Sequence, residues 1–268
     1  REFRGKKGAG IASNPKTGGI LSYVSSPDYS PDLFTGLVSR NDWELIITDP
    51  DKPLLNRVSN GTYPPGSIYK MVVAFELLEK KLVSTDWEII CTGSYEFYDR
   101  TFRCWNEVGH GKVNLEKAII QSCDVFFYQA IQNVNLDELK IRSKEFLHGI
   151  PTNIDLPTEM KGRVPDRQFM NKLYGRWGWS KGALLNISIG QGELLVTPLQ
   201  MAAYINLLAT QGSTYPLHLV QQNKELIEAP MISKRSWRLI GEYMGKSISN
   251  TKGTGRLSDP KIRGLKIA

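Results

Sequence analysis

Apolar residues are grouped most densely in residues 67–81, which contain no glycine or proline. Around a helix axis these residues would be apolar on nearly every side, from Ile68 through Leu78. Such a pattern is typical of a helix buried inside a larger body. Similar patterns predict helices over 115–132 and 198–211, and an amphipathic helix over 236–248. Helices therefore dominate the middle of the chain.

Strand patterns are confined to the two ends. Residues 8–12 and 19–25 flank a turn-rich segment, 13–18, and this arrangement predicts a β-hairpin. Residues 26–66 are rich in loops, and residues 264–268 indicate the start of another strand. We find no internal repeat and no linker, so the sequence predicts one domain, residues 1–268, of mixed helix and sheet.

Composition and charge exclude several classes of protein. The chain has 268 residues with 34 Lys and Arg against 27 Asp and Glu, a net charge of +7. The basic residues are spread along the chain and match no nucleic-acid motif, so we expect no nucleic-acid partner. The longest apolar runs, 71–78 and 201–208, are far shorter than the roughly 20 residues that cross a bilayer. We therefore expect no membrane span inside this chain.

Ser67 and Lys70 form a Ser-x-x-Lys at the start of the predicted buried helix. A spacing of three places both side chains on one helix face. Serine is a weak nucleophile, and a lysine whose charge is disfavoured by burial can take its proton. The spacing alone leaves a helix-capping serine with a surface lysine as an open alternative. The second candidate element is Ser122-Cys123-Asp124 downstream.

Several further stretches occur together with these two elements in a characteristic order. The chain resembles the transpeptidase domain of class B penicillin-binding proteins, most closely the elongation-type penicillin-binding protein 2 group. The stretches that carry the resemblance are Pro15-Lys16-Thr17-Gly18-Gly19, residues 26–34, Tyr63-Pro64-Pro65-Gly66-Ser67, Gly109-His110-Gly111, Ser122-Cys123-Asp124 with Phe126-Phe127-Tyr128, and Gly190-Gln191-Gly192 before Thr197-Pro198.

The resemblance implies a fold and a set of catalytic roles. The fold is α/β (α+β), of the penicillin-recognising serine transpeptidase and β-lactamase-like type, in which helices flank an antiparallel sheet and an all-helical subdomain carries Ser122. Ser67 would be the acylated nucleophile, Lys70 its general base, and Ser122 the hydroxyl that passes protons to the leaving amine. Asp124 stands where many relatives have Asn, and it either binds the substrate amide or braces the loop.

The resemblance also implies an activity. The chain would belong to a peptidoglycan D,D-transpeptidase that cross-links stem peptides in cell-wall elongation and rod shape, and β-lactams would acylate the same serine. Expected partners are a membrane glycosyltransferase and other elongation-complex proteins. The expected location is periplasmic, on an inner-membrane anchor upstream. A serine β-lactamase and a non-catalytic β-lactam sensor of the same fold remain alternatives.

A third family element, Lys-Thr/Ser-Gly on a strand beside the nucleophile, is not found at its expected place. In relatives it follows a segment like 264–268, whereas Lys16-Thr17-Gly18 lies in the hairpin turn. We therefore expect that the chain stops just before this motif and lacks the last strands of the sheet. Loss of one oxyanion donor alone costs ~2.7 to 4 kcal/mol, so we expect weak activity or none.

All three cysteines and one histidine form a second group of candidate site residues. Cys91, Cys104, His110 and Cys123 give the pattern Cys-x12-Cys-x5-His-x12-Cys. Three thiolates and an imidazole suit tetrahedral zinc, and four protein ligands favour a structural role. Some relatives resemble this chain in carrying zinc beside the active site. A disulfide between Cys91 and Cys104, or three unrelated core thiols, remain alternatives.

The other histidines and two tryptophans have no pattern that points to chemistry. We assign His148 and His218 to filling of the core or surface. Trp177 and Trp179 lie in a glycine-punctuated segment predicted as a surface loop. They either line a glycan or peptide groove or pack over the loop, and the second interpretation is favoured.

Overall fold

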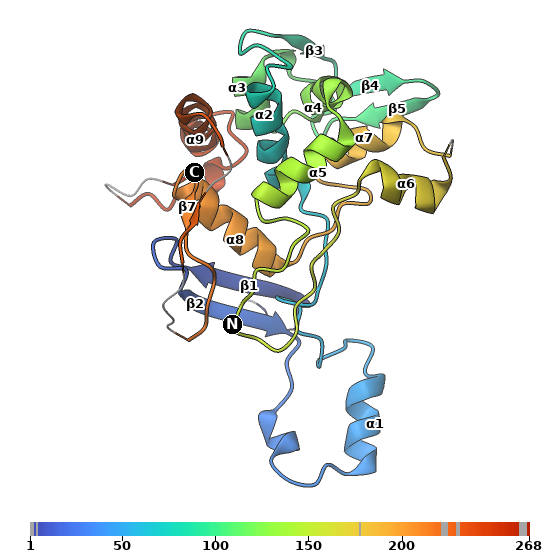
Figure 1. Ribbon diagram of the computed structural model, residues 1–268, viewed down its shortest axis with the longest axis vertical. Coiled ribbons are helices and arrows are strands. Elements are labelled where there is room, and N and C mark those ends of the chain that lie inside the picture. The colour runs from blue at the N-terminus through green and yellow to red at the C-terminus, as the bar shows by residue number, and fades with distance from the viewer. Residues whose placement is uncertain (1–2, 4, 177, 221–224, 229–230, 263–266) are drawn as a thin grey trace. The chain divides into compact units, whose positions relative to one another are not determined.

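The computed structural model describes residues 3, 5–176, 178–220, 225–228, 231–262 and 267–268 (Figure 1). The chain forms two compact units, each assembled from segments distant in sequence. The first consists of residues 1–63, 147–163 and 195–228, and the second of residues 64–146, 164–194 and 229–268.

The first unit is built on the N-terminal β-hairpin. Strand β1 (Gly8–Ser13) pairs antiparallel with β2 (Ile20–Ser26), which confirms the predicted hairpin. Helix α8 (Pro198–Ala209) packs against β1 (Figure 1). Thr197 begins this helix with a reciprocal capping box to Gln200. The unit also contains η1 (Pro31–Phe34), α1 (Arg40–Thr48), β7 (Ser213–Thr214) and β8 (Ile227–Glu228).

Apolar side chains of α8 and of the loops around it form the core of this unit, and partly buried hairpin residues, among them Ile11 and Ile20, pack against it. The buried members come from three separate segments: Val58, Ile154, Leu199, Ala202, Ala203 and Leu217. Gln200 is fully buried in the same region, and its amide nitrogen donates to the carbonyl oxygens of Ile150 (2.7 Å) and Lys161 (2.8 Å). These bonds connect the 147–163 segment to α8. They also satisfy the buried amide of Gln200, which would cost free energy if it had no partners.

His148 makes the first unit sensitive to acid. Its ring is completely buried against Tyr204, with ring centroids 4.6 Å apart, and burial lowers its pKa to about 3. An unfolded histidine, with a pKa of about 6.5, binds a proton that the folded protein does not, so stability falls as the pH drops from that value. Between pH 7.5 and pH 5 we expect this group to reduce the free energy of unfolding by about 2 kcal/mol.

Urea unfolding at both pH values measures this effect, and His148→Phe should remove most of it. An equal loss of stability in the wild type and in the variant would contradict the assignment.

The second unit is mainly helical. Helix α2 (Lys70–Glu79), which begins just after Ser67, is contacted by α3 (Leu115–Ile120), α4 (Asp124–Ala130), α5 (Leu136–Glu145) and α9 (Lys234–Ser249) (Figure 1). The other helices of this unit are η2 (Gly66–Tyr69), η3 (Ile131–Asn133), α6 (Arg167–Tyr174), α7 (Lys181–Ser188) and η4 (Arg256–Ser258). Two short antiparallel pairs complete it: β3 (Ile89–Cys91) with β6 (Gly111–Val113), and β4 (Ser94–Phe97) with β5 (Arg100–Arg103).

Helix α2 is the centre of this unit. Eight of its ten residues are buried, as the all-round apolar pattern predicted. Phe75 packs between Phe146 (centroids 4.9 Å apart) and Trp237 of α9 (4.7 Å). The buried carboxylate of Glu76 accepts from Arg142 Nε (2.9 Å), so the charge enclosed in this core is paired. Helix α2, which begins just after Ser67, is therefore held on several sides.

The single helix predicted over 115–132 is wrong. The structure has α3 and α4 separated by residues 121–123, and Ser122 has a φ of 52°. This left-handed conformation ends α3, and Cys123 begins α4 with an extended backbone. The apolar pattern continues through the break because both helices are buried, so periodicity could not reveal it.

The predicted helices at 198–211 and 236–248 are confirmed as α8 and α9. Helices α1, α5, α6 and α7 were not predicted. Most of the strand predicted at 264–268 lies outside the described residues, and so does Trp177. Among the helices that the structure describes, none has the length and apolar character needed to cross a bilayer.

Candidate active site

Ser67 lies in a tight turn just before α2, and the 3-10 helix η2 provides this first turn. Ser67 itself is exposed, whereas Lys70 is buried and only 1% of its surface is exposed. Gly66 N–H donates to the carbonyl oxygen of Gly190 (2.9 Å). A Cβ on Gly190 would lie 2.1 Å from the Gly66 oxygen, so only glycine permits this approach. The Gly-Gln-Gly segment thus supports the serine turn.

The Lys70 ammonium donates to three acceptors, which matches its three N–H groups. These acceptors are the Ser122 carbonyl oxygen (2.9 Å), Ser122 Oγ (3.0 Å) and Asp124 Oδ1 (2.6 Å). Its Nζ also lies 5.5 Å from the ring centroid of Phe127. The structure thus brings Lys70 to the Ser122-Cys123-Asp124 segment, more than 50 residues away in sequence.

Ser122 connects Lys70 to Ser67. Its Oγ accepts from Lys70 and donates to Ser67 Oγ (3.1 Å). Lys70 reaches Ser67 through this hydroxyl, and the structure has no direct hydrogen bond between them. The three side chains therefore form one continuous chain from an exposed hydroxyl to a buried amine.

Asp124 braces the loop from within. Oδ1 accepts from Lys70, and Oδ2 accepts from the Trp105 backbone N–H (3.0 Å). Since both oxygens have partners inside the protein, the geometry favours bracing over contact with a substrate amide. No sequence pattern pointed to Trp105, whose indole N–H also donates to the Gln121 carbonyl oxygen (2.9 Å).

Asp124→Ala should destabilise the chain by ~3 to 5 kcal/mol, because it leaves the Lys70 charge buried without its counter-ion. Asp124→Asn keeps an oxygen for Lys70 and is the matched control, with a smaller expected loss. The free energy of unfolding in urea measures both variants. Equal losses in the two would show that the ion pair does not stabilise this loop.

Cys91, Cys104, His110 and Cys123 come together in a buried cluster. Their candidate ligand atoms all lie within 4.8 Å of one another. His110 Nδ1 is 3.5 Å from Cys91 Sγ and 3.6 Å from Cys104 Sγ. Zinc bonds of about 2.3 Å to sulfur and 2.0–2.1 Å to nitrogen, at the tetrahedral angle, would place these atoms about 3.6 Å apart. The donor set and its spacing fit a four-coordinate metal.

Backbone geometry shapes the loop that presents His110. Its N–H donates to the Cys91 carbonyl oxygen (3.0 Å), and Gly109 has a φ of 81°. A Cβ on Gly109 would lie 2.3 Å from that same Cys91 oxygen. Glycine before His110 therefore lets the loop close onto β3, which accounts for part of the Gly-His-Gly stretch.

The thiols of this cluster are free, so the alternative disulfide between Cys91 and Cys104 is not formed. The hydrogen bond from the Cys123 thiol lowers the pKa of Cys104 to about 5. The same bond, together with burial, raises the pKa of Cys123. One thiolate is thus already favoured without an ion, and thiolates are the form of cysteine that binds metals.

Comparison with known proteins places this chain in a family. The family model described as Penicillin binding protein transpeptidase domain matches residues 8–268. The chain belongs to this transpeptidase family. Within it, the chain is of the penicillin-binding protein 2 (PBP2, or MrdA) type, and its fold is the penicillin-binding transpeptidase fold.

Relatives and solved structures agree on this type. The chain is similar to the peptidoglycan D,D-transpeptidase MrdA of Escherichia coli, with 32% identity over 223 residues, 82% of this chain and 35% of MrdA. It is also similar to PBP2 of Helicobacter pylori, with a TM-score of 0.90 and 33% identity over 98% of this chain and 50% of that one. The PBP2 structure from Pseudomonas aeruginosa has a TM-score of 0.86 and 32% identity, and the match covers 95% of this chain and 58% of that one. The chain thus spans about a third to somewhat over half of these proteins.

Proposed function

We propose that this chain is the acylating part of a peptidoglycan D,D-transpeptidase of cell-wall elongation. The hydrogen-bonded chain from Ser67 through Ser122 to Lys70 is the observation that carries the proposal. Its place in a transpeptidase family, with named D,D-transpeptidases as relatives, supports the reaction.

In the proposed reaction, Ser67 Oγ attacks the carbonyl carbon between the two D-Ala residues of a stem peptide. The C–N bond breaks, the terminal D-Ala leaves with a proton on its nitrogen, and an acyl ester remains on Ser67. An amine of a second stem peptide then attacks this ester and regenerates the serine. A β-lactam would acylate the same oxygen by opening its ring.

The residues of this chain would move the protons. In its reactive form Lys70 has lost one of the three protons that it donates in the resting site, and its free lone pair accepts the Ser67 proton by way of the Ser122 hydroxyl, which can rotate to donate in either direction. The same hydroxyl then returns a proton to the departing amine. Asp124 keeps Lys70 and the loop in place and does not touch the substrate. The position of Ser67 at the first turn before α2 favours the oxyanion that forms there.

Zinc is the ion that we propose for the cysteine and histidine cluster. It would be held by Cys91, Cys104, His110 and Cys123, and it would supply structural cross-linking rather than chemistry, since four protein ligands leave no position for water. Cys123 lies between Ser122 and Asp124, so the ion would restrain the loop that presents the proton-transferring hydroxyl.

Elongation-complex proteins are the partners that we propose, with stem peptides as substrate. A similar Helicobacter pylori PBP2 has a structure in complex with MreC, and another similar structure is of a peptidoglycan synthase complex. The corresponding location is the periplasmic side of the inner membrane, where the cell-wall substrate is found.

The lifetime of the penicillin adduct and the release of D-Ala test this function together. We would incubate the natural gene product that contains this sequence with benzylpenicillin, and separately with a D-Ala-D-Ala pentapeptide. A transpeptidase should give a long-lived adduct and release D-Ala. An adduct that clears within seconds would indicate a β-lactamase, and a stable adduct without D-Ala release would indicate a sensor.

A further inference from the structure

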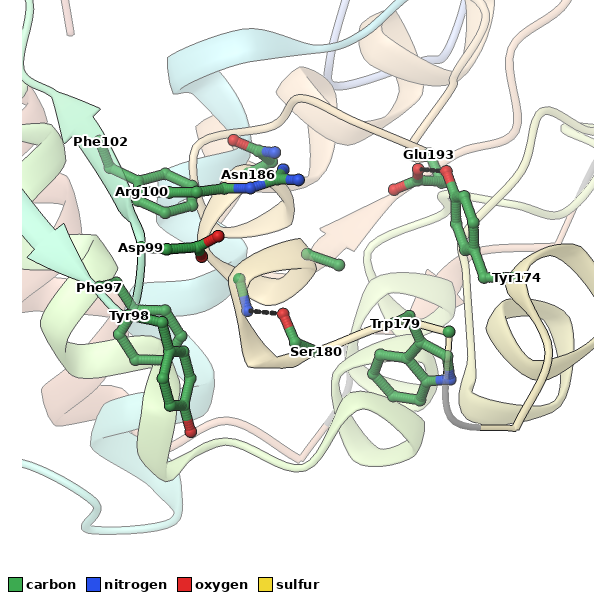
Figure 2. A pocket seen from close by; sticks show the side chains of 13 residues that line it. Phe97, Tyr98, Asp99, Arg100, Phe102, Tyr174, Trp179, Ser180, Asn186 and Glu193 are labelled. Atoms are coloured by element: carbon green, nitrogen blue, oxygen red, sulfur yellow. Dashed lines mark hydrogen bonds between the residues drawn. The ribbon is translucent and has the colours of Figure 1, made fainter.

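A cavity of about 350 Å³ lies wholly within the second unit, between the β4–β5 hairpin and the segment that joins α6 to α7 (Figure 2). Its volume is in the range of small-molecule sites. None of the residues proposed above for catalysis or for the metal lines it. The main lining side chains are Phe97, Asp99, Arg100, Tyr174, Trp179 and Asn186.

Polar groups of both charges face this cavity. Asp99 and Arg100 extend into it from the hairpin, opposite Tyr174 and Trp179 (Figure 2). Across the described part of the chain, no hydrogen bond or ion pair engages the exposed side chains of Asp99, Arg100 or Asn186. The cavity thus offers an acceptor, a donor and an amide that provides both, while a second carboxylate on its wall, Glu193, accepts from the Tyr174 hydroxyl.

Aromatic rings form the apolar part of the walls. The Trp179 indole N–H donates to Asn171 Oδ1 (2.7 Å), which orients the ring. The Tyr174 hydroxyl donates to Glu193, so this ring is also held in place. Phe97 and Tyr98 pack edge to face on the hairpin side, with centroids 4.7 Å apart. Rings held in this way present flat apolar surfaces next to unpaired polar groups.

A ligand with a flat apolar face and a polar edge fits this combination, and a sugar ring has both. We propose that the cavity binds a saccharide ring of the peptidoglycan glycan strand, with the ring stacked on an aromatic wall and its hydroxyl and amide groups bonded to Asp99, Arg100 and Asn186. The inference rests on the proposed function, since that function supplies the glycan.

Two short segments join the cavity to the candidate active site. On one side, Asn186 accepts through its backbone from Gln191 N–H (2.9 Å), and the neighbouring Gly190 contacts Gly66 before the nucleophile. On the other side, β5 leads directly to Cys104 and to Trp105, whose N–H bonds to Asp124. A glycan strand bound in the cavity would therefore be held beside the segments that carry Ser67 and Ser122.

Calorimetric titration of the N-acetylglucosamine tetramer into this chain tests the inference. We expect saturable binding, weakened at least tenfold by Trp179→Ala and by Arg100→Ala. Arg100 is exposed and unpaired, so Arg100→Ala should fold normally. It therefore keeps the test valid if Trp179→Ala fails to fold. Trp43→Ala, which removes a 45%-exposed tryptophan on α1, is the matched control and should bind as the wild type does.

The same samples are tested with benzylpenicillin and with a D-Ala-D-Ala pentapeptide. A wild-type chain that does not bind the tetramer overturns the saccharide site, and penicillin acylation in that sample would leave the proposed function intact. Tetramer binding without acylation of the natural gene product would overturn the proposed function and support the site. Pentapeptide binding that depends on Trp179 more strongly than tetramer binding would overturn the saccharide assignment.

Discussion

Replacement of Lys70 by Ala is expected to slow the acylation of Ser67 by benzylpenicillin by at least about 100-fold. A positioned general base contributes roughly 10² to 10⁴ in rate. Lys70 is the buried end of the hydrogen-bonded chain to Ser67, and no other described amine or imidazole bonds to Ser122 or Ser67. The rate of adduct formation, followed by intact mass, measures this effect in the natural gene product.

The control must separate loss of the base from loss of the fold. Removing Lys70 leaves Asp124 as a buried carboxylate without its counter-ion, which costs ~3 to 5 kcal/mol. The double variant Lys70→Ala with Asp124→Ala removes both charges and should recover part of that stability without recovering the rate. Lys140→Ala, at a partly exposed ion pair with Asp166, is the matched lysine control and should react normally. A Lys70→Ala rate within a few-fold of the wild type would exclude Lys70 as the base.

Removal of the metal is expected to destabilise the protein and to slow acylation together. Zinc present at 1,000 times its dissociation constant contributes about 4 kcal/mol, which corresponds to a fall in Tm of about 10 °C on removal. Acylation should slow because Cys123 is in the loop between Ser122 and Asp124. Emission spectrometry should find one zinc per chain before a strong chelator is added and none afterwards.

The variant His110→Ala provides the comparison for chelation. It removes one ligand outside the Ser122 loop, so it should lower the zinc content and make Tm insensitive to the chelator. A chain purified without zinc and with an unchanged Tm in chelator would contradict the metal assignment. A zinc-bound chain whose acylation rate survives chelation would leave the ion structural but independent of the loop.

Burial patterns allowed much of the fold to be predicted, but its interruptions could not be. The α2 helix is surrounded by apolar neighbours, and its sequence is apolar on every side for that reason. The same property concealed the break between α3 and α4, because Ser122 adopts its left-handed backbone where Lys70 and Trp105 contact the loop from distant segments. Helix α1 has no buried residue, so burial left no pattern in its sequence.

The sequence predicted which residues make up the candidate site, but it did not predict the hydrogen bonds between them. Ser67 and Lys70 were predicted from a local spacing, and the metal cluster from the use of every cysteine. The placement of Ser122 between Ser67 and Lys70 depends on a contact across 52 residues. The two Asp124 oxygens are engaged across 54 residues by Lys70 and across 19 residues by Trp105. No local pattern encodes such contacts. The wall of the cavity at Asp99 and Arg100 depends in the same way on a hairpin that the sequence did not predict.

Mass analysis of the protein after incubation with benzylpenicillin tests the central claim most directly. The natural gene product and its Ser67→Ala variant are compared, and the adduct is located by peptide mapping. We expect one stable adduct per molecule of the natural gene product, on the peptide that contains Ser67, and no adduct on the variant. An adduct that persists in Ser67→Ala, or that maps to another residue of the wild type, would contradict the proposed nucleophile.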